Sequence, residues 1–180
     1  MSLLSDNNID FQRSIPNKSD FKISGGIHSS FLINNSILQQ EFEKFVISLK
    51  AKNAHLLEKR YYYINIWSMA CKPCLDEIPL IDSLLSSFTN QITYVMVSSH
   101  SNEAVSNFLK NKNIEMKNFV FLNEMIDFIS GIYNEIEVKK QSFPLHVVLD
   151  KKGNCLAYLF GAIHDENSAA PLINFIKTLK

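Results

Sequence analysis

Hydrophobic and polar positions follow two kinds of pattern along most of the chain. Apolar residues recur every three or four positions in five segments, a spacing that predicts amphipathic helices. These segments are 36–59, 71–88, 102–112, 123–133 and 168–180. Between them lie short runs rich in β-branched and aromatic residues, which predict strands. The predicted strands are 61–67, 91–98, 118–122, 145–150 and 155–161.

Strands and helices alternate along this pattern, which favours an α/β sheet containing parallel strands. The last two strands flank the sequence Lys-Lys-Gly-Asn, which predicts a hairpin turn with Gly153 in a left-handed conformation. Pro79 lies inside the second helical pattern, where we expect a kink. The sheet should therefore end in an antiparallel hairpin followed by a helix.

The N-terminal part of the chain has a weaker pattern. Residues 1–20 are polar and lack periodicity, so we expect a loose N-terminal arm. Short apolar pieces flank Gly25 and Gly26, and they predict one or two short strands. Residues 21–180 should then form a single domain.

Composition narrows the classes of function. The chain has 180 residues, 46% of them hydrophobic, which suits one domain with a substantial core. The formal net charge is zero and the basic residues are scattered, so we expect no nucleic-acid partner. No segment approaches the roughly 20 apolar residues that cross a bilayer, and the start lacks the pattern of a signal peptide. We expect a monomer.

Three cysteines are present, too few for a disulfide-stapled scaffold. Cys71 and Cys74 stand two residues apart where a predicted strand gives way to a helix. The partial positive charge of the helix start stabilises a thiolate there. Lys72 adds positive charge, and Pro73 suits a first turn because it lacks an N–H group. This arrangement favours Cys71 as an exposed nucleophile and Cys74 as a more buried resolving thiol.

Two other interpretations of the cysteine pair are a metal site and packing without a chemical role. Structural zinc needs four ligands, but there is no second Cys-x-x-Cys, and the five histidines lack ligand spacing. We therefore expect no metal site. Leu75 follows Cys74, so the attachment motif of c-type haem is absent. The cysteines could also be packed side chains without a chemical role.

Two longer motifs resemble a known family. The sequence "NIWSMACKPCLDEIP" resembles the active-site motif of the thioredoxin superfamily, most closely the TlpA/ResA-like thiol–disulfide oxidoreductases. "SFPLHVVLDKKGN" resembles the strand that a cis-proline opens in that family, and the likeness covers about residues 61–180. The matching positions are Asn65, Trp67, Cys71, Pro73, Cys74, Glu77, Pro79, Pro144 and Gly161.

The resemblance implies a thioredoxin-like three-layer fold, with a mixed central sheet flanked by helices. It implies exchange of disulfides with protein partners through Cys71 and Cys74, with an upstream redox protein and no organic cofactor. It also implies a bacterial protein of the periplasm or cell envelope. Residues expected to line the substrate site are Trp67, Ala70, Phe143 and Pro144, the last as a cis-proline. The alternative is a non-catalytic binding module on the same fold, either a metallochaperone or a thiol-holding chaperone.

Several positions depart from the family or have two interpretations. Ala70 replaces a usual tryptophan, which should open the surface beside Cys71. His146 replaces a small hydroxyl residue; strand alternation favours a structural role for it over tuning of the thiols. Glu77 could act on Cys74 as a base or as a local charge. Alternatively, it could lie exposed and complement the helix dipole. Asn65 stands where classical thioredoxins carry a buried aspartate, and Cys155 is expected to be a buried small hydrophobe.

Overall fold

The structure is a computed structural model that describes residues 11–12, 36–115, 117–136 and 141–179. The predicted alternation of strands and helices is confirmed in this part of the chain. The elements are β1 (Phe11–Gln12), α1 (Ser36–Lys52), β2 (Tyr61–Ile66), α2 (Lys72–Leu85), β3 (Ile92–Val97), α3 (Asn102–Asn111), β4 (Phe119–Leu122), α4 (Ile126–Glu135), β5 (Leu145–Asp150), β6 (Cys155–Phe160) and α5 (Glu166–Thr178). No helix of the described residues is long and apolar enough to cross a membrane.

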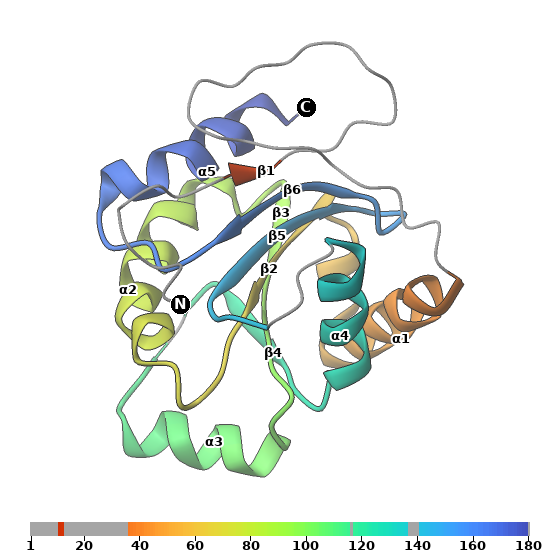
Figure 1. Ribbon diagram of the computed structural model, residues 1–180, viewed down its shortest axis with the longest axis horizontal. Coiled ribbons are helices and arrows are strands. Elements are labelled where there is room, and N and C mark those ends of the chain that lie inside the picture. The colour runs from red at the N-terminus through yellow and green to blue at the C-terminus, as the bar shows by residue number, and fades with distance from the viewer. Residues whose placement is uncertain (1–10, 13–35, 116, 137–140, 180) are drawn as a thin grey trace, which may run out of the picture.

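The strands form one mixed sheet in the order β1-β6-β5-β2-β3-β4 (Figure 1). β2, β3 and β4 run parallel, whereas β5 is antiparallel to both of its neighbours, β2 and β6. β1 belongs to the segment predicted as a loose arm, and its pairing with β6 was not predicted. The short strands predicted around Gly25 and Gly26 lie outside the described residues.

Helices cover both faces of the sheet, which gives the three layers that the resemblance implies. α2 and α5 lie on one face, and α1 and α4 lie on the other (Figure 1). Side chains alternate along each strand, so each face carries its own buried cluster. Tyr63, Met96 and Val148 pack toward α2 and α5, while Ile64 and Val147 pack toward α1 and α4.

Local capping explains where the helices differ from the predicted ranges. The first helix ends at Lys52 rather than at residue 59, because Asn53 caps a separate 3-10 turn by accepting the His55 N–H at 3.0 Å. The last helix begins two residues earlier than predicted, because Asp165 and Ser168 form a capping box. α2 continues through Pro79 as one helix.

The hairpin between β5 and β6 turns at Gly153, whose φ of +88° confirms the predicted left-handed conformation. Asp150 organises the turn by accepting the N–H groups of Lys152 and Asn154, at 2.8 and 2.9 Å. A Cβ atom at position 153 would lie 2.8 Å from the Phe42 ring of α1. The hairpin therefore needs glycine both for its backbone and for its contact with α1.

Gly153→Ala should lower the free energy of unfolding by about 2–4 kcal/mol, because backbone strain and overlap with Phe42 add. Urea denaturation measures this as a lower midpoint. Gly161 is the matched control, since its φ is +98° and nothing lies within 4 Å of a Cβ built there. Gly161→Ala should show the strain alone, about 1–2 kcal/mol. Equal losses in the two variants would contradict the packing contribution.

Candidate active site

The cysteine pair lies where β2 leads into α2. Cys71 is the N-cap of α2, and its Sγ accepts the Cys74 N–H at 3.2 Å. Cys71 and Cys74 form a disulfide, with their Cα atoms 5.3 Å apart. The Cys71 side chain is half-buried, whereas Cys74 is fully buried against the core. Cys71 is therefore the more exposed cysteine of the two.

The positive charge expected beside Cys71 is smaller than the sequence suggests. Lys72 donates from Nζ to Asp76 Oδ2 at 2.5 Å, and both side chains are largely exposed. Such an i, i+4 pair is typical of a helix surface. Of the two predicted sources of thiolate stabilisation, the helix N-terminus is therefore the stronger one.

The loop before Cys71 is held by a histidine that the sequence pattern did not single out. His100 Nε2 accepts the Met69 N–H at 3.2 Å and lies 3.2 Å from the Ser68 hydroxyl. The Ser68 Oγ accepts the Ala70 N–H, and the Ser68 carbonyl accepts the Cys71 N–H at 3.0 Å. His100 thus fixes the backbone that carries Cys71, although 29 residues separate the two in sequence.

The four predicted substrate-site residues occupy different environments. Ala70 is exposed and Phe143 half-buried, while Pro144 is buried and follows a cis peptide bond. Leu145 pairs with Ile66, so Pro144 lies at the same edge of the sheet as the end of β2. Trp67 is 1% exposed and packs on Phe108 and Phe121, so its ring belongs to the core cluster beneath α2 and α5.

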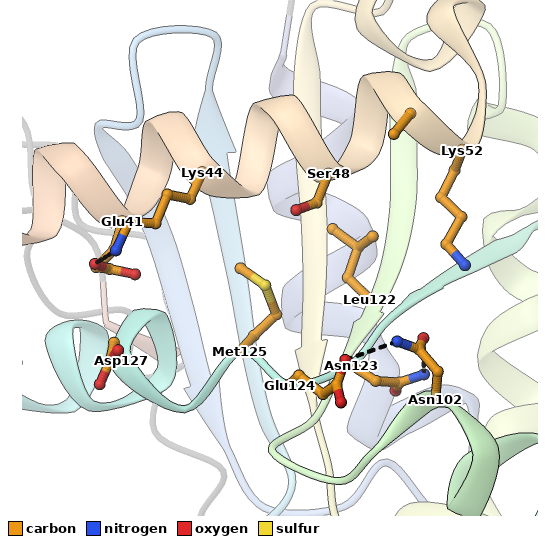
Figure 2. A pocket seen from close by; sticks show the side chains of 11 residues that line it. Glu41, Lys44, Ser48, Lys52, Asn102, Leu122, Asn123, Glu124, Met125 and Asp127 are labelled. Atoms are coloured by element: carbon orange, nitrogen blue, oxygen red, sulfur yellow. Dashed lines mark hydrogen bonds and ion pairs between the residues drawn. The ribbon is translucent and has the colours of Figure 1, made fainter.

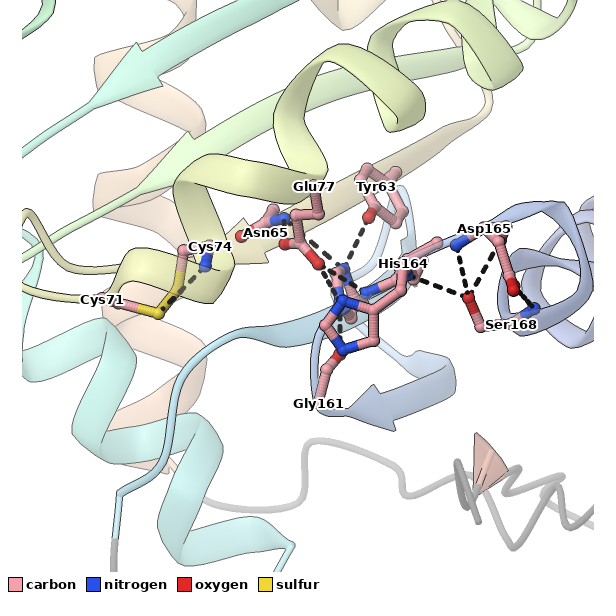
Figure 3. A network of polar contacts seen from close by, with 11 residues as sticks. Tyr63, Asn65, Cys71, Cys74, Glu77, Gly161, His164, Asp165 and Ser168 are labelled. Atoms are coloured by element: carbon pink, nitrogen blue, oxygen red, sulfur yellow. Dashed lines mark hydrogen bonds and ion pairs between the residues drawn. A yellow bond between two sulfur atoms is a disulfide. The ribbon is translucent and has the colours of Figure 1, made fainter. Parts of the chain in front are cut away.

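Behind Cys74, one turn along α2, a carboxylate is buried. Glu77 is 1% exposed, so the interpretation of an exposed first-turn carboxylate is wrong. Its Oε1 accepts from Asn65 Nδ2 at 2.8 Å, and its Oε2 accepts the Ile163 N–H at 2.8 Å (Figure 3). Helical spacing places Cys74 and Glu77 on the same face of α2. The carboxylate is therefore a buried acceptor one helical turn from Cys74.

Burial raises the pKa of the Glu77 carboxyl above its ordinary value, because the charged form loses solvation. His146 and the hydrogen bonds from Ile163 and Asn65 act in the opposite direction and limit the rise in pKa. A carboxyl with these features can exchange a proton nearer to neutral pH than an exposed glutamate does.

His146 faces the same side of the sheet as the cysteine pair. Strand alternation had favoured a position away from the thiols, but Asn65 and His146 are direct partners across β2 and β5. His146 Nδ1 lies 2.7 Å from the Tyr63 hydroxyl, and its Nε2 lies 3.0 Å from the Gly161 carbonyl. His146 Nε2 is also 3.5 Å from Glu77 Oε2. The ring is thus both a hydrogen-bonded core residue and a neighbour of Glu77.

Cys155 is separate from this site. It is fully buried in the cluster beneath α1 and α4, while Cys74 belongs to the cluster beneath α2 and α5. Burial raises the pKa of the Cys155 thiol strongly. The structure therefore matches the expectation of a small buried hydrophobe. Among the described residues, no group of three or more His, Cys, Asp or Glu side chains could hold a metal ion.

An open pocket of about 610 Å³ lies elsewhere on the molecule, between α1 and the start of α4 (Figure 2). Several of its polar side chains already pair with one another: Lys44 with Glu41 at 2.5 Å, and Asn102 with Glu124 at 2.9 Å. The residues that line it include neither cysteine of the pair, nor Glu77. It is not part of the candidate active site.

Comparisons with known proteins support the fold. No protein-family model matches the chain, and no curated protein sequence does. Among solved structures, a thiol:disulfide interchange protein of the thioredoxin family from Chlorobium tepidum is similar at 22% identity and a TM-score of 0.50. That alignment covers 69% of this chain and 81% of the other. The chain therefore has the thioredoxin fold.

Two further solved structures are similar at lower scores. StoA from Bacillus subtilis is 20% identical with a TM-score of 0.44, over 64% of this chain and 81% of StoA. The thioredoxin domain of a thiol-disulfide oxidoreductase from Bacteroides vulgatus is 17% identical with a TM-score of 0.48, over 67% of this chain and 81% of that domain.

His100→Ala should slow alkylation of reduced Cys71 by about threefold to tenfold, the effect of losing one hydrogen bond. Without an acceptor for the Met69 N–H, Cys71 spends less time at the N-terminus of α2, where its thiolate is stabilised. His100→Gln should restore the rate, because its side-chain oxygen can accept the same N–H. The exposed His55 provides a control, and His55→Ala should react like the unaltered protein. Equal rates for the Gln and Ala variants of His100 would contradict a positioning role.

Proposed function

We propose that this protein is a thiol–disulfide oxidoreductase that acts on protein disulfides through Cys71 and Cys74. One observation carries the proposal: the two cysteines form a disulfide at the N-terminus of α2, with Cys71 partly exposed and Cys74 buried. A nucleophile at a helix start and a shielded partner are what thiol–disulfide exchange requires. The thioredoxin fold and the resemblance of the motif around the cysteines support the same activity.

The reaction begins from the reduced pair. The Cys71 thiolate attacks one sulfur of a substrate disulfide, the substrate S–S bond breaks, and the other substrate sulfur leaves as a thiolate. Cys74 then gives up its proton and attacks Cys71 Sγ. The mixed disulfide breaks, the second substrate sulfur leaves as a thiolate, and the Cys71–Cys74 disulfide forms. Two electrons pass from the pair to the substrate, and a partner redox protein returns the pair to its reduced form.

Glu77 is proposed to accept the Cys74 proton in the second step. A buried thiol resists ionisation, so the step needs a base close to it. Glu77 lies one turn from Cys74 on the same helix face, and its raised pKa places the carboxyl nearer to neutral pH. Asn65 cannot take a proton, but it orients the carboxylate through its 2.8 Å hydrogen bond.

We propose the reducing direction and a location in a bacterial cell envelope, both on the resemblance to TlpA/ResA-like proteins. Pro73 stands between the cysteines where reducing thioredoxins also carry proline. Ala70 and Phe143 are proposed to contact the partner protein, because they are the members of the predicted substrate site that reach the surface.

The protein should catalyse reduction of insulin by dithiothreitol. The rate should be at least about a hundredfold lower in Cys71→Ser. Cys74→Ser should instead accumulate a mixed disulfide with insulin, visible on a non-reducing gel. Cys155→Ala serves as a control with unchanged activity, because that thiol lies on the other side of the sheet. An inactive wild type that binds copper or zinc tightly would favour the non-catalytic binding module.

Glu77→Gln should slow release of the mixed disulfide by about a hundredfold at neutral pH, the size expected for loss of a general base. In the wild type this rate should fall as pH falls through the raised pKa of Glu77, because the carboxylate becomes protonated. The Gln variant should lack that step, which stopped-flow single-turnover kinetics can measure. The same pH profile in both proteins would contradict the role of Glu77.

The pH dependence of the free energy of unfolding tests the raised pKa of Glu77 independently. A carboxyl whose pKa is raised by folding binds its proton more tightly in the folded state. The contribution of this tighter binding to the free energy of unfolding is therefore fully present below the ordinary pKa of 4.5. It is lost as pH rises through the raised pKa. Wild type should lose unfolding free energy across that window, and Glu77→Gln should not. Urea denaturation at a series of pH values measures the difference.

A further inference from the structure

His146 is a buried titratable group to which the proposed reaction gives no role. Its side chain is 1% exposed and comes from β5, directly opposite Asn65 of β2. The ring stacks near Tyr63 with a centroid distance of 6.0 Å and an interplanar angle of 23°. The imidazole therefore has fixed neighbours on both of its nitrogens, and these neighbours determine which nitrogen carries a proton.

The hydrogen bonds assign the tautomer. The Gly161 carbonyl can only accept, so Nε2, at 3.0 Å from it, carries the proton. The Tyr63 hydroxyl then donates to Nδ1 at 2.7 Å. Asn65 Nδ2, 3.5 Å from Nδ1, is also a donor. Both groups beside Nδ1 are donors, which favours an unprotonated Nδ1 and a ring whose single N–H points to the Gly161 carbonyl.

Among the described residues, the hydrogen-bond partners of the Glu77 carboxylate are both donors. Asn65 donates to Oε1 (Figure 3), and Ile163 donates to Oε2. The Nε2 atom of His146 lies 3.5 Å from Oε2. The Asn65 Oδ1 atom, which could accept a proton from a neutral carboxyl, has no hydrogen-bond partner among the described residues. The arrangement suits a carboxylate rather than a carboxylic acid, even though burial disfavours the charge.

His146 acts on this carboxylate by two routes. Its Nε2, whose proton goes to the Gly161 carbonyl, lies 3.5 Å from Oε2, and in a dry interior the positive end of this N–H group stabilises a nearby negative charge more than it would in water. It also holds the Gly161 carbonyl, two residues before Ile163, whose N–H donates to the same oxygen. The other ionisable side chains around the pair are Tyr63 of β2, Cys74 of α2 and the exposed His164 before α5, which acts on Glu77 only through its charge.

We propose that His146 is a positioning residue for Glu77, which keeps the buried carboxylate ionised and thereby sets the pH range in which Cys74 can resolve a mixed disulfide. The kinetic part of this inference rests on the proposed function. The ionisation of Glu77 does not, because it is a property of the folded protein whether or not it exchanges disulfides.

The test compares two variants of His146. Leucine removes the donor, so the pKa of Glu77 should rise further, whereas glutamine offers one donor and one acceptor and should restore it. NMR of the labelled Glu77 carboxyl carbon follows the titration directly. The rate of mixed-disulfide release at neutral pH should fall about tenfold in His146→Leu, the effect of one lost interaction with a charged group, and recover in His146→Gln. In a Glu77→Gln background, His146→Leu should cause no further change in the pH profile.

A Glu77 that titrates at the same pH in wild type and in His146→Leu would overturn the proposal. So would a folded His146→Gln that behaves like the leucine variant. If His146→Leu fails to fold, nitrogen NMR of wild type still decides. The ring should carry its proton on Nε2, and its nitrogens should sense the titration of Glu77, an effect that Glu77→Gln abolishes. A shifted Glu77 titration in a protein that cannot reduce insulin would leave this inference standing and refute the proposed function.

Discussion

The antiparallel pairing of β2 with β5 is the constraint on which the candidate site depends. β2 leads into the cysteine loop, and β5 begins directly after Pro144. Their register sets Ile66 opposite Leu145 and Asn65 opposite His146. A slip of one residue would turn His146 toward α1 and remove it from Glu77, because side chains alternate between the faces of a sheet. The strand register therefore fixes which polar groups lie behind the cysteine pair.

That register also explains how a carboxylate can be buried in the core of this fold. An isolated charge in such a place would be expelled or neutralised, since burial costs far more than a single hydrogen bond returns. Glu77 accepts hydrogen bonds from Asn65 and from the loop at Ile163, and His146 Nε2 lies 3.5 Å from its Oε2. The net result is a pKa above the ordinary value, because the loss of solvation outweighs these interactions. A group balanced in this way can change its protonation state with small changes in its surroundings, which is what a proton acceptor needs.

Local pattern was sufficient to predict most of the fold. The helical spacing of apolar residues predicted the helices, runs of β-branched and aromatic residues predicted the strands, and Gly153 marked the hairpin. The helix ends were less predictable, because caps such as Asn53 and Asp165 compete with propensity over single residues. The pairing of β1 with β6 left no local signal, since a strand of two residues carries no periodicity.

In the candidate site, too, features that depend on neighbouring residues were predictable, and features that depend on residues far along the chain were not. The position of Cys71 and Cys74 at a helix start was predictable, because the local sequence encodes both the end of the strand and the start of the helix. The burial of Glu77 was not, because it depends on Ile163, 86 residues away, and on a strand partner. His100 and His146 look alike in the sequence, as single histidines without ligand spacing. In the fold they lie near different cysteines. His100 holds the loop that carries the half-buried Cys71, and His146 borders Glu77, one helical turn from the buried Cys74. Each cysteine thus has its own histidine nearby, so the two steps of the proposed exchange are open to separate adjustment.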